Sequence, residues 1–544
     1  MTQDRHFTLD RRELMAMLTA ATGVAVTGTA AAQETDMAAY ITANSGAREY
    51  KSMFPHDNFR DWMEDLERRG LVMRVKRMDQ DAFEMAALAF RLMDCIGMYE
   101  APAVLVEEVK IDGKWMKGPV IFNHMGHWDT EAIALGLEPV PNHGTLTYRN
   151  CIQHMLKMLE DNGGKVPSIP PVEVARDKAP VKEQVYTGDD INIYDFPFIT
   201  SNPGDSGRYV NTGSVFTEDV ELGKNFGTYR CEIKGQRKIG VNPEPGQGAW
   251  KMFMAKKERG EKEAVCSIVL GQDPMVWTIS GSAIAKSGKE DEMALAGGMR
   301  GKAIEVVKSE TNDIMIPANA EMVIEGIVPL DEPMEPEGPF GEMYGYLGLK
   351  KSENFFMNIT AITCRKDPWI LNQFTGVTRG FVTAPLEGVS IARLRKLAPQ
   401  IVDFHSPVEA TGLGFLSIKK EKPGQALSIG KRVARIVPIT KVLVVVDDED
   451  MDVYNRTQMM FAMGSRWQPY PATEIIESAR GMPLDPSSPD RPNSSKIIID
   501  ATRQWPEEGG PDGYPELNRT LLTKLAPESW ERVDAKWGCL LYTS

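Results

Sequence analysis

Cysteine and histidine are scarce in this chain. Its 544 residues include only six cysteines and seven histidines, and no two cysteines form a Cys-x-x-Cys pair. Zinc sites and disulfide frameworks need such residues at fixed spacings, so neither is predicted. His124 and His127, in NHMGHW, are the closest pair of histidines, and there is no His-Glu-x-x-His motif. We interpret the pair as structural, which makes a metal-dependent hydrolase a poor interpretation.

Excess positive charge and long apolar runs are also absent. The chain has 62 Lys and Arg against 76 Asp and Glu, a net charge of -14. A general nucleic-acid binder needs basic surface, so no nucleic-acid partner is predicted. Beyond the N-terminus no segment reaches the roughly 18 apolar residues of a membrane span, so the mature chain is expected to be soluble. The length predicts two or three domains.

The N-terminus has the features of an export signal. A twin arginine, Arg11-Arg12, precedes an uncharged stretch rich in Ala, Thr and Gly, which ends in the small residues Ala30-Ala31-Ala32. We interpret residues 1–32 as a twin-arginine signal peptide, which predicts a periplasmic protein. The alternative is an ordinary amphipathic helix that begins with two arginines, and the protein would then be cytoplasmic.

The remaining chain divides into four parts that differ in their expected secondary structure. Residues 33–119 mix helix and strand, as in the helical DNFRDWMEDLERRG and the alternating LVMRVKRM. Residues 120–365 are rich in short strand-like runs, among them RKIGVNP, AVCSIVLG, MVWTISG and AIEVVKS. Residues 366–500 read as α/β, with a helix in SIARLRKLAPQ and strands in KVLVVVDDED and KIIIDAT. Residues 501–544 read as a helix or tail.

One stretch, EPEGPFGEMYGY, places two acids around a rigid linker. Glu337 and Glu342 flank Gly-Pro-Phe-Gly, whose residues exclude a helix and predict a tight turn. Two neighbouring carboxylates cannot both ionise cheaply, so the pKa of one of them rises. A carboxyl group with a raised pKa can donate a proton at neutral pH. The alternative is a pair of solvated loop acids.

Three further stretches carry weaker signals. KNFGTYRCEIKGQRKIGVNPEPGQGAWKMF combines Asn225, Arg230 and Gln247 with a glycine-rich loop at the start of a helix. Backbone N–H groups in such a loop can bind an anion. The second stretch begins at Glu292 and continues into ETNDIMIPANAEMVIEG, and the third, GFLSIKKEKPGQA, places Lys419 and Lys420 near glycines. None of the three is specific alone.

Taken together, and in their order along the chain, the four stretches resemble the UbiD family of decarboxylases. The resemblance covers most of the chain after about Ala47 and is strongest from Asn225 to Tyr346. Around EGPFGEMYGY the chain is most similar to the fungal ferulic acid decarboxylase branch. The family's fold implies an α+β and α/β multidomain protein. It would have an N-terminal flavin-binding region with a split β-barrel, a connecting helix, a C-terminal α/β domain and an active site between the domains.

The resemblance also implies a catalytic network. Arg230, Glu337 and Glu342 fall on the family's Glu–Arg–Glu positions. Glu342 would then be the proton donor that replaces the lost CO₂, Arg230 would hold the network, and Glu337 would complete it. In this family prenylated FMN accepts the electrons left on carbon, while the protein supplies orientation and the proton.

The family's cofactor residues carry over only in part. Asn225, Arg230, Gln247, Ser280, Glu292 and Lys419 match positions that contact the flavin, its phosphate or its metal, with Lys420 an alternative to Lys419. The family binds a divalent metal, usually manganese, through an Asn, a His and a Glu, with potassium nearby. Asn225 and Glu292 match two of these ligands, but Gly248 stands where the family has histidine. Water, Glu244 or Gln247 would have to replace that ligand.

The resemblance therefore predicts reversible decarboxylation of an aromatic or α,β-unsaturated acid, with carboxylation as the reverse direction. A flavin prenyltransferase would supply the cofactor, and homodimers or hexamers are usual. The alternative, which Gly248 favours, is a catalytically altered flavin-binding homologue or a partner subunit of a carboxylase complex. The intact set of Arg230, Glu337 and Glu342 favours catalysis.

Overall fold

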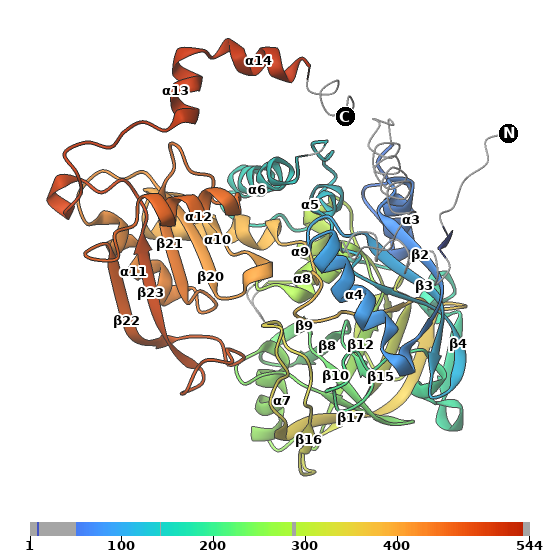
Figure 1. Ribbon diagram of the computed structural model, residues 1–544. Helices are drawn as coiled ribbons and strands as arrows, with labels where there is room; N and C mark the ends of the chain where they lie inside the picture. The colour runs from blue at the N-terminus through green and yellow to red at the C-terminus, as the bar shows by residue number, and fades with distance from the viewer. Residues whose placement is uncertain (1–7, 10–50, 142, 286–289, 537–544) are drawn as a thin grey trace. The chain divides into compact units, whose positions relative to one another are not determined.

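The computed structural model describes residues 8–9, 51–141, 143–285 and 290–536 (Figure 1). Their contacts divide the chain into two compact units, of which the first ends at Val389 and the second begins at Ser390. Apart from Thr8–Leu9, the predicted signal peptide lies outside the described residues. No helix in the described ranges is long and apolar enough to cross a membrane.

The first unit begins with a mixed sheet of five strands in the order β1-β2-β3-β4-β18. Helices α3 (Phe59–Arg68) and α4 (Glu84–Cys95) accompany it, and the side chain of Asn58 caps α3. Figure 1 shows α4 running beside β2, and its face of Met85, Leu88 and Leu92 is buried. The predicted helix in DNFRDWMEDLERRG and strand in LVMRVKRM are confirmed. The strands span Thr8–Leu9 (β1), Val72–Asp79 (β2), Ala103–Ile111 (β3), Lys114–Phe122 (β4) and Ile370–Leu371 (β18).

A ten-stranded sheet forms the centre of the same unit, with the path β7-β10-β11-β17-β15-β12-β8-β9 and with β6 and β16 paired to β17. Its apolar strands bury Ile268, Ile324 and Ile362 completely. Each such side chain stabilises the fold by about 1.5–3 kcal/mol. The sheet therefore holds the loops at its edges in defined positions. The strands span Gln184–Thr187 (β6), Tyr209–Val210 (β7), Ser214–Asp219 (β8), Gly223–Thr228 (β9), Cys231–Gly235 (β10), Lys238–Val241 (β11), Glu263–Leu270 (β12), Met322–Pro329 (β15), Glu335–Glu337 (β16) and Lys351–Cys364 (β17).

Helices α7 (Gly248–Glu258) and α8 (Pro274–Gly281) contact β9 at the edge of this sheet. Helix α9 (Glu292–Arg300) contacts α8, and its first residue accepts a hydrogen bond from the amide of Phe226 in β9. The helix expected in AWKMFMAKKERG is confirmed as α7. The strand expected in MVWTISG is wrong, because this stretch is helix α8. Asp273 caps its first turn by accepting hydrogen bonds from the N–H groups of Met275 and Val276, and Pro274 opens the helix. This cap outweighs the strand preference of the β-branched and aromatic residues that follow.

The first unit also contains a three-stranded sheet, two helices that follow β4, and a helix at its C-terminal end. The sheet has the order β14-β13-β5, and its central strand confirms the strand expected in AIEVVKS. Helix α10 begins in this unit and ends in the second, and confirms the helix expected in SIARLRKLAPQ. The bounds are Val172–Glu173 (β5), Glu305–Lys308 (β13), Met315–Pro317 (β14), Trp128–Ala134 (α5), Gly144–Asp161 (α6) and Ala384–Leu397 (α10).

The second unit is an α/β domain around a sheet of order β19-β20-β21-β23-β22. Its three inner strands pair in parallel, and helix α11 packs against β21, β22 and β23. The strands expected in KVLVVVDDED and KIIIDAT are β21 and β23, and the predicted mixed α+β and α/β fold class is confirmed. The elements are Ile401–His405 (β19), Leu413–Ile418 (β20), Gln425–Ile436 (α11), Val442–Asp447 (β21), Arg456–Ser465 (α12), Thr473–Arg480 (β22), Asn493–Asp500 (β23), Asn518–Leu525 (α13) and Glu528–Asp534 (α14).

Candidate active site

The stretch from Glu335 to Gly348 forms a strand followed by a tight hairpin. Glu337 ends β16 and pairs with Lys351 of β17, after which Gly338 adopts a positive φ of 78°. The amide of Glu342 donates to the carbonyl of Tyr346 at 2.9 Å, and that of Gly348 donates to Phe340 at 2.8 Å. The Gly-Pro linker is therefore not helical, as predicted, but the tight turn follows Glu342, where the amide of Gly345 donates to the carbonyl of Glu342 at 2.9 Å. Both acids nevertheless lie close to one arginine.

Arg230 joins the two acids. It lies between β9 and β10, and its Nε and Nη2 donate to the two carboxylate oxygens of Glu337, each at 2.8 Å. Its Nη1 donates to Oε1 of Glu342. The side chains of Arg230 and Glu342 are about a tenth exposed, whereas that of Glu337 is fully buried. A single guanidinium thus holds Glu337 by a paired contact and Glu342 by a single contact, as its fork of donors allows.

Burial sets the proton affinities of this network. It raises the pKa of Glu342, and the charge and hydrogen bond of Arg230 offset only part of that effect. Burial alone would lower the pKa of Arg230, but its contacts with the two glutamates raise it, so the guanidinium stays charged. The site therefore combines a permanent cation with a carboxyl group that is biased toward keeping its proton.

Asn225 and Glu292 line one cavity. Asn225 belongs to β9 and Glu292 begins α9, and both line a cavity of about 50 Å³. The amide of Phe226 donates to Oε2 of Glu292 at 2.7 Å. Burial raises the pKa of Glu292 to about 7. The cavity has room for an ion or a few water molecules, and these two side chains supply oxygen ligands of the kind that hard divalent cations prefer.

The third ligand position does not fit a metal. Gly248 begins α7, and a Cβ atom on it would lie 1.9 Å from Oδ1 of Asn225. The amide of Asn225 thus fills the space that a histidine side chain would enter. Within the described ranges, no group of three or more His, Cys, Asp and Glu residues is placed to hold a metal ion. The Asn–His–Glu ligand set is therefore incomplete here.

Ser280 and Gln247 differ in how they are placed. Ser280 is buried in α8, and its hydroxyl lies 2.9 Å from that of Thr228 at the end of β9. Gln247 is the exposed residue before α7, and its Oε1 accepts a hydrogen bond from the amide of Glu244 at 2.6 Å. Ser280 therefore lies close to the strand that carries Asn225, whereas Gln247 stabilises its own loop.

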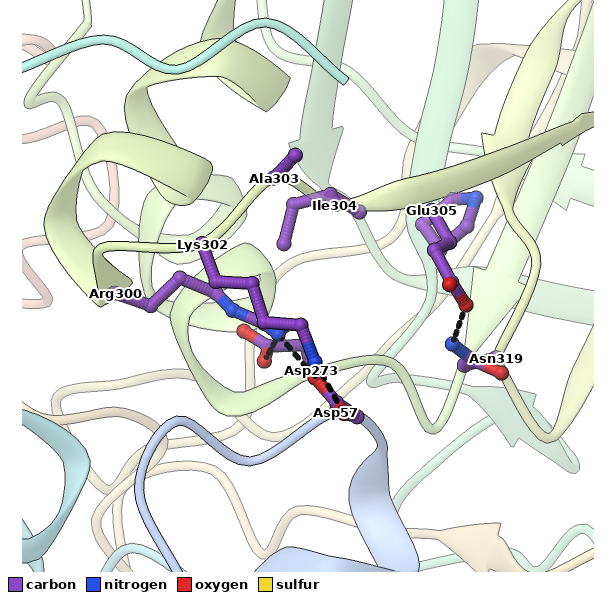
Figure 2. A pocket seen from close by; sticks show the side chains of 9 residues that line it. Asp57, Asp273, Arg300, Lys302, Ala303, Ile304, Glu305 and Asn319 are labelled. Atoms are coloured by element: carbon purple, nitrogen blue, oxygen red, sulfur yellow. Dashed lines mark hydrogen bonds and ion pairs between the residues drawn. The ribbon is translucent and has the colours of Figure 1, made fainter. Parts of the chain in front are cut away.

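A buried ion pair ties the two site-bearing helices together. Nη1 of Arg300, at the end of α9, donates to Oδ2 of Asp273 at 2.6 Å, and Asp273 caps α8 (Figure 2). Nη2 of Arg300 and Nζ of Lys302 reach Asp57, which precedes α3. The cavity that these residues line measures about 10 Å³, room for about one water molecule. This cluster supports α8 and α9, which carry Ser280 and Glu292.

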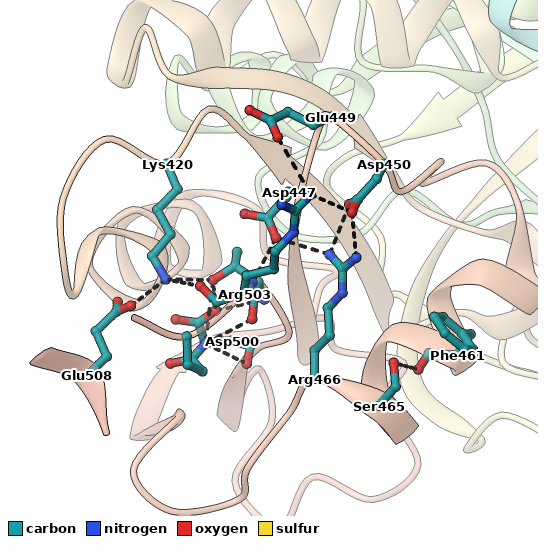
Figure 3. Close-up of polar contacts among 12 residues, drawn as sticks. Lys420, Asp447, Glu449, Asp450, Phe461, Ser465, Arg466, Asp500, Arg503 and Glu508 are labelled. Carbon is teal, nitrogen blue, oxygen red and sulfur yellow. Dashed lines mark hydrogen bonds and ion pairs between the residues drawn. The ribbon is translucent and has the colours of Figure 1, made fainter. Parts of the chain in front are cut away.

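The two candidate phosphate-binding lysines belong to the second unit. Nζ of Lys420 donates to Oγ1 of Thr502 and to the carbonyl of Arg503, both at 2.9 Å, and to Glu508 (Figure 3). Its side chain is only 3% exposed, and all these partners belong to the second unit, so this lysine stabilises the second unit itself. Lys419 is exposed at the end of β20. Of the two, Lys419 therefore has the more accessible side chain.

The two neighbouring histidines have structural positions. His124 is completely buried, and burial lowers its pKa to about 3, so it stays neutral. Nδ1 of His127 caps α5 by accepting a hydrogen bond from the amide of Asp129 at 3.0 Å. Both positions agree with the structural interpretation of this pair.

Sequence reasoning overlooked one segment that touches the network. Tyr209 donates to Oε1 of Glu337 at 3.1 Å, and Oδ1 of Asp205 accepts a hydrogen bond from the amide of Gly341 at 2.9 Å. The only local sign was the turn-forming stretch SNPGDSG, which by itself predicts a loop.

Comparison with known proteins identifies the family. Residues 63–146, 172–378 and 381–501 match the N-terminal, Rift-related and C-terminal domains of 3-octaprenyl-4-hydroxybenzoate carboxy-lyase. The chain is 30% identical over 494 residues to a phenolic acid decarboxylase of Sedimentibacter hydroxybenzoicus, covering 88% of this chain and 97% of the relative. The vanillic acid decarboxylase structure of the same organism, in its closed form, matches with a TM-score of 0.73 and 26% identity over 88% of this chain and 99% of that one.

A second solved structure gives the same result. The UbiD-class enzyme HmfF of Pelotomaculum thermopropionicum, in complex with FMN, matches with a TM-score of 0.70 and 26% identity, covering 87% of this chain and 100% of that one. Both relatives share the architecture over nearly their whole length. The chain therefore belongs to the UbiD family of carboxy-lyases.

Proposed function

We propose that this protein catalyses the reversible, non-oxidative decarboxylation of an aromatic or α,β-unsaturated carboxylic acid, with prenylated FMN as cofactor. The observation that carries the proposal is the division of Arg230 between Glu337 and Glu342. The phenolic acid and vanillic acid decarboxylases to which the chain is similar point to an aromatic substrate.

The residues around β9 are the ones that we propose to hold the flavin. Asn225, Arg230 and Ser280 lie on β9, just after it and in the contacting helix α8, where they would hold the cofactor beside the acids. When bound, prenylated FMN would supply the electron sink of the reaction. The family's manganese and potassium have less support, because Gly248 supplies no side-chain ligand and its position is closed by Asn225.

The chain's own residues would handle the proton. Loss of CO₂ from a carboxylate consumes one proton, which must reach the carbon that carried the carboxyl group. The raised pKa of Glu342 keeps this proton available, and Arg230 fixes the direction in which the carboxyl group points. Glu337 balances the charge of Arg230, so the arginine need not hold Glu342 permanently ionised.

The test is the release of CO₂ by protein that has been co-produced with a flavin prenyltransferase. Vanillate, other hydroxybenzoates and cinnamates would form the substrate panel, and Glu342→Gln protein purified in the same way is the control. We expect turnover of at least one aromatic acid by the wild type alone. Native mass spectrometry of the same sample would show whether prenylated FMN is bound, whether a metal accompanies it, and whether the protein is a homodimer or hexamer.

The second candidate is a flavin-binding homologue with altered catalysis, or a partner subunit of a carboxylase complex. The incomplete metal-ligand set at Gly248 favours it. Protein that carries prenylated FMN but neither releases CO₂ from any acid in the panel nor exchanges ¹³CO₂ into products would support this candidate.

We also propose export to the periplasm through the twin-arginine route, which carries folded proteins that have already bound their cofactors. The support is the sequence around Arg11 and Arg12. Cell fractionation of the wild type and of a double Arg11→Lys, Arg12→Lys variant tests it. We expect shortened, periplasmic wild-type protein and retained variant, whereas full-length wild type found only in the cytosol would contradict the proposal.

A further inference from the structure

The segment Asn202–Tyr209 lies along the linker between Glu337 and Glu342. The amide of Ser206 donates to the carbonyl of Pro339, and Oδ1 of Asp205 accepts from the amide of Gly341, both at 2.9 Å. The other carboxylate oxygen of Asp205 accepts a hydrogen bond from the amide of Asn202 at 2.9 Å, which closes the segment's own turn. The backbone immediately before Glu342 is therefore held on a second, folded loop.

Tyr209 contacts the same linker through its side chain. It is 1% exposed, and its hydroxyl donates to Oε1 of Glu337 at 3.1 Å. This oxygen also accepts a hydrogen bond from Nε of Arg230. Oγ of Ser206 donates to Oε1 of Glu232 at 2.7 Å and lies 2.8 Å from the Tyr209 hydroxyl, so it contacts the oxygen whose hydrogen points to Glu337.

Aromatic contacts complete this arrangement. The rings of Tyr209 and Phe340 lie 4.5 Å apart, and the guanidinium carbon of Arg230 lies 5.3 Å from the centre of the Phe340 ring. Phe340 is thus packed between Tyr209 and Arg230, where the attraction between a cation and an aromatic face adds to the hydrogen bonds. The segment contacts Glu337, Pro339, Phe340 and Gly341, which are four of the five residues before Glu342.

We propose that Tyr209 and Asp205 are positioning residues for proton transfer by Glu342. Tyr209 fixes Glu337 and, through it, Arg230, whereas Asp205 fixes the backbone at Gly341. Neither side chain has a described contact with Glu342 itself, so both act through other residues. The inference rests on the proposed role of Glu342, but the geometry that it describes can be measured without any turnover.

The first test compares Tyr209→Phe with Tyr186→Phe. Tyr186 is a half-buried tyrosine of β6 whose hydroxyl donates to Gln184 at 3.3 Å, away from the network, so it serves as the matched control. We expect Tyr209→Phe to lower kcat by roughly 10- to 100-fold with little change in KM, because small displacements of reacting groups have effects of this size. An unchanged kcat, or an equal loss in Tyr186→Phe, would overturn the inference.

The second test measures amide hydrogen exchange in flavin-free protein. We expect amides of residues 337–348 to exchange about threefold to tenfold faster in Tyr209→Phe and Asp205→Asn, as the loss of one or two hydrogen bonds predicts. Residues 263–270 of β12 serve as the internal reference and should not change. Unchanged exchange in residues 337–348 would overturn the inference even if the enzyme is active.

The two readouts separate this inference from the proposed function. Faster exchange in a protein whose wild type releases no CO₂ would leave the positioning geometry intact and reject the function. If Tyr209→Phe does not fold, Ser206→Ala replaces it, because it leaves Tyr209 in place and removes the hydroxyl that contacts Tyr209 and Glu232. Ser206→Ala should show the same change in exchange at a smaller size, and its absence would again overturn the inference.

Discussion

The two units of this protein each contain a cluster of arginines and acids, and the clusters differ in how many arginines contact the acid at their centre. In the first unit one arginine, Arg230, is shared by Glu337 and Glu342. In the second unit two arginines, Arg466 and Arg503, donate to Asp450, and Arg466 also donates to Asp447 at 3.1 Å (Figure 3). The proportion of arginines to acid therefore differs between Glu342 and Asp450.

The proton affinities follow this proportion. Burial acts to raise the pKa of both Glu342 and Asp450. At Glu342 the raised pKa persists, because Arg230 is divided between two carboxylates. At Asp450 the hydrogen bonds and charges of Arg466 and Arg503 outweigh burial and lower the pKa. At Asp447, to which Arg466 donates through one nitrogen, burial still raises the pKa to about 6. The guanidinium contacts that each acid receives, weighed against its burial, thus separate Glu342 from Asp450.

Removal of one arginine from each cluster should destabilise both clusters but lower catalytic activity only in the first unit. Arg230→Ala leaves two buried carboxylates without their cation, and Arg466→Ala removes one of two cations from Asp450. We expect Arg230→Ala to lower the free energy of unfolding by about 3–5 kcal/mol and to abolish turnover. Arg466→Ala should destabilise less, because Arg503 remains, and should keep kcat within about twofold. Denaturant unfolding and CO₂ release would measure both effects, and full activity in Arg230→Ala would reject the comparison.

Neutralising one acid in each cluster tests which of them transfers a proton. Glu342→Gln keeps the side-chain shape and leaves Arg230 paired with Glu337, so the fold and flavin binding should persist. We expect kcat to fall by about 10²- to 10⁴-fold, the usual contribution of a general acid. Asp450→Asn is the matched variant and should leave kcat unchanged. Loss of flavin from the Glu342→Gln protein would instead assign this acid a structural role.

The two acids should also give pH dependences of opposite sign. Because Glu342 must be protonated, kcat should fall as the pH rises through its raised pKa. Its protonation stabilises the fold fully below the unfolded pKa of about 4.3, and this stabilisation is lost as the pH rises through the folded value. Asp450, with a lowered pKa, stabilises the fold above about pH 3.9, and its effect is lost as the pH falls through the folded value.

Unfolding free energies of Glu342→Gln and Asp450→Asn, each subtracted from the wild type across the pH range, would isolate these two effects. The first difference should favour the wild type more at pH 4 than at pH 8. The second should favour it more at pH 7 than at pH 3. A kcat that does not fall at high pH would contradict the assignment of Glu342 as the donor.

Two glycines offer the smallest and most local test. A Cβ atom on Gly348 would lie 2.7 Å from Oε1 of Glu342, whereas one on Gly464 in α12 would meet no atom within 4 Å. Gly348→Ala should displace the acid, lowering kcat about tenfold and stability by about 1–3 kcal/mol. Gly464→Ala should raise stability by roughly 0.5–1 kcal/mol and leave kcat unchanged, because alanine favours a helix. Equal kinetics in the two variants would show that Glu342 tolerates displacement.

The sequence allowed prediction of features that depend on local chemistry. Proline and glycine between Glu337 and Glu342 exclude a helix, so a non-helical linker could be anticipated, and so could strands such as β2, β12 and β21, whose apolar residues follow a local pattern. The assignment of MVWTISG as a strand failed because one preceding residue, Asp273, caps the helix. Tyr209 and Asp205 were missed because their partners, Glu337 and Gly341, lie more than 100 residues away, where no local pattern signals a contact.

The close contact between Gly248 and Asn225 has a consequence for how this site can change during evolution. Because the amide of Asn225 fills the space beside Gly248, the two positions are not independent. A histidine introduced at Gly248 would meet the amide of Asn225 before it could act as a ligand, so this side chain has to move when Gly248 is replaced. Directed evolution of metal binding should therefore begin from paired libraries at the two positions.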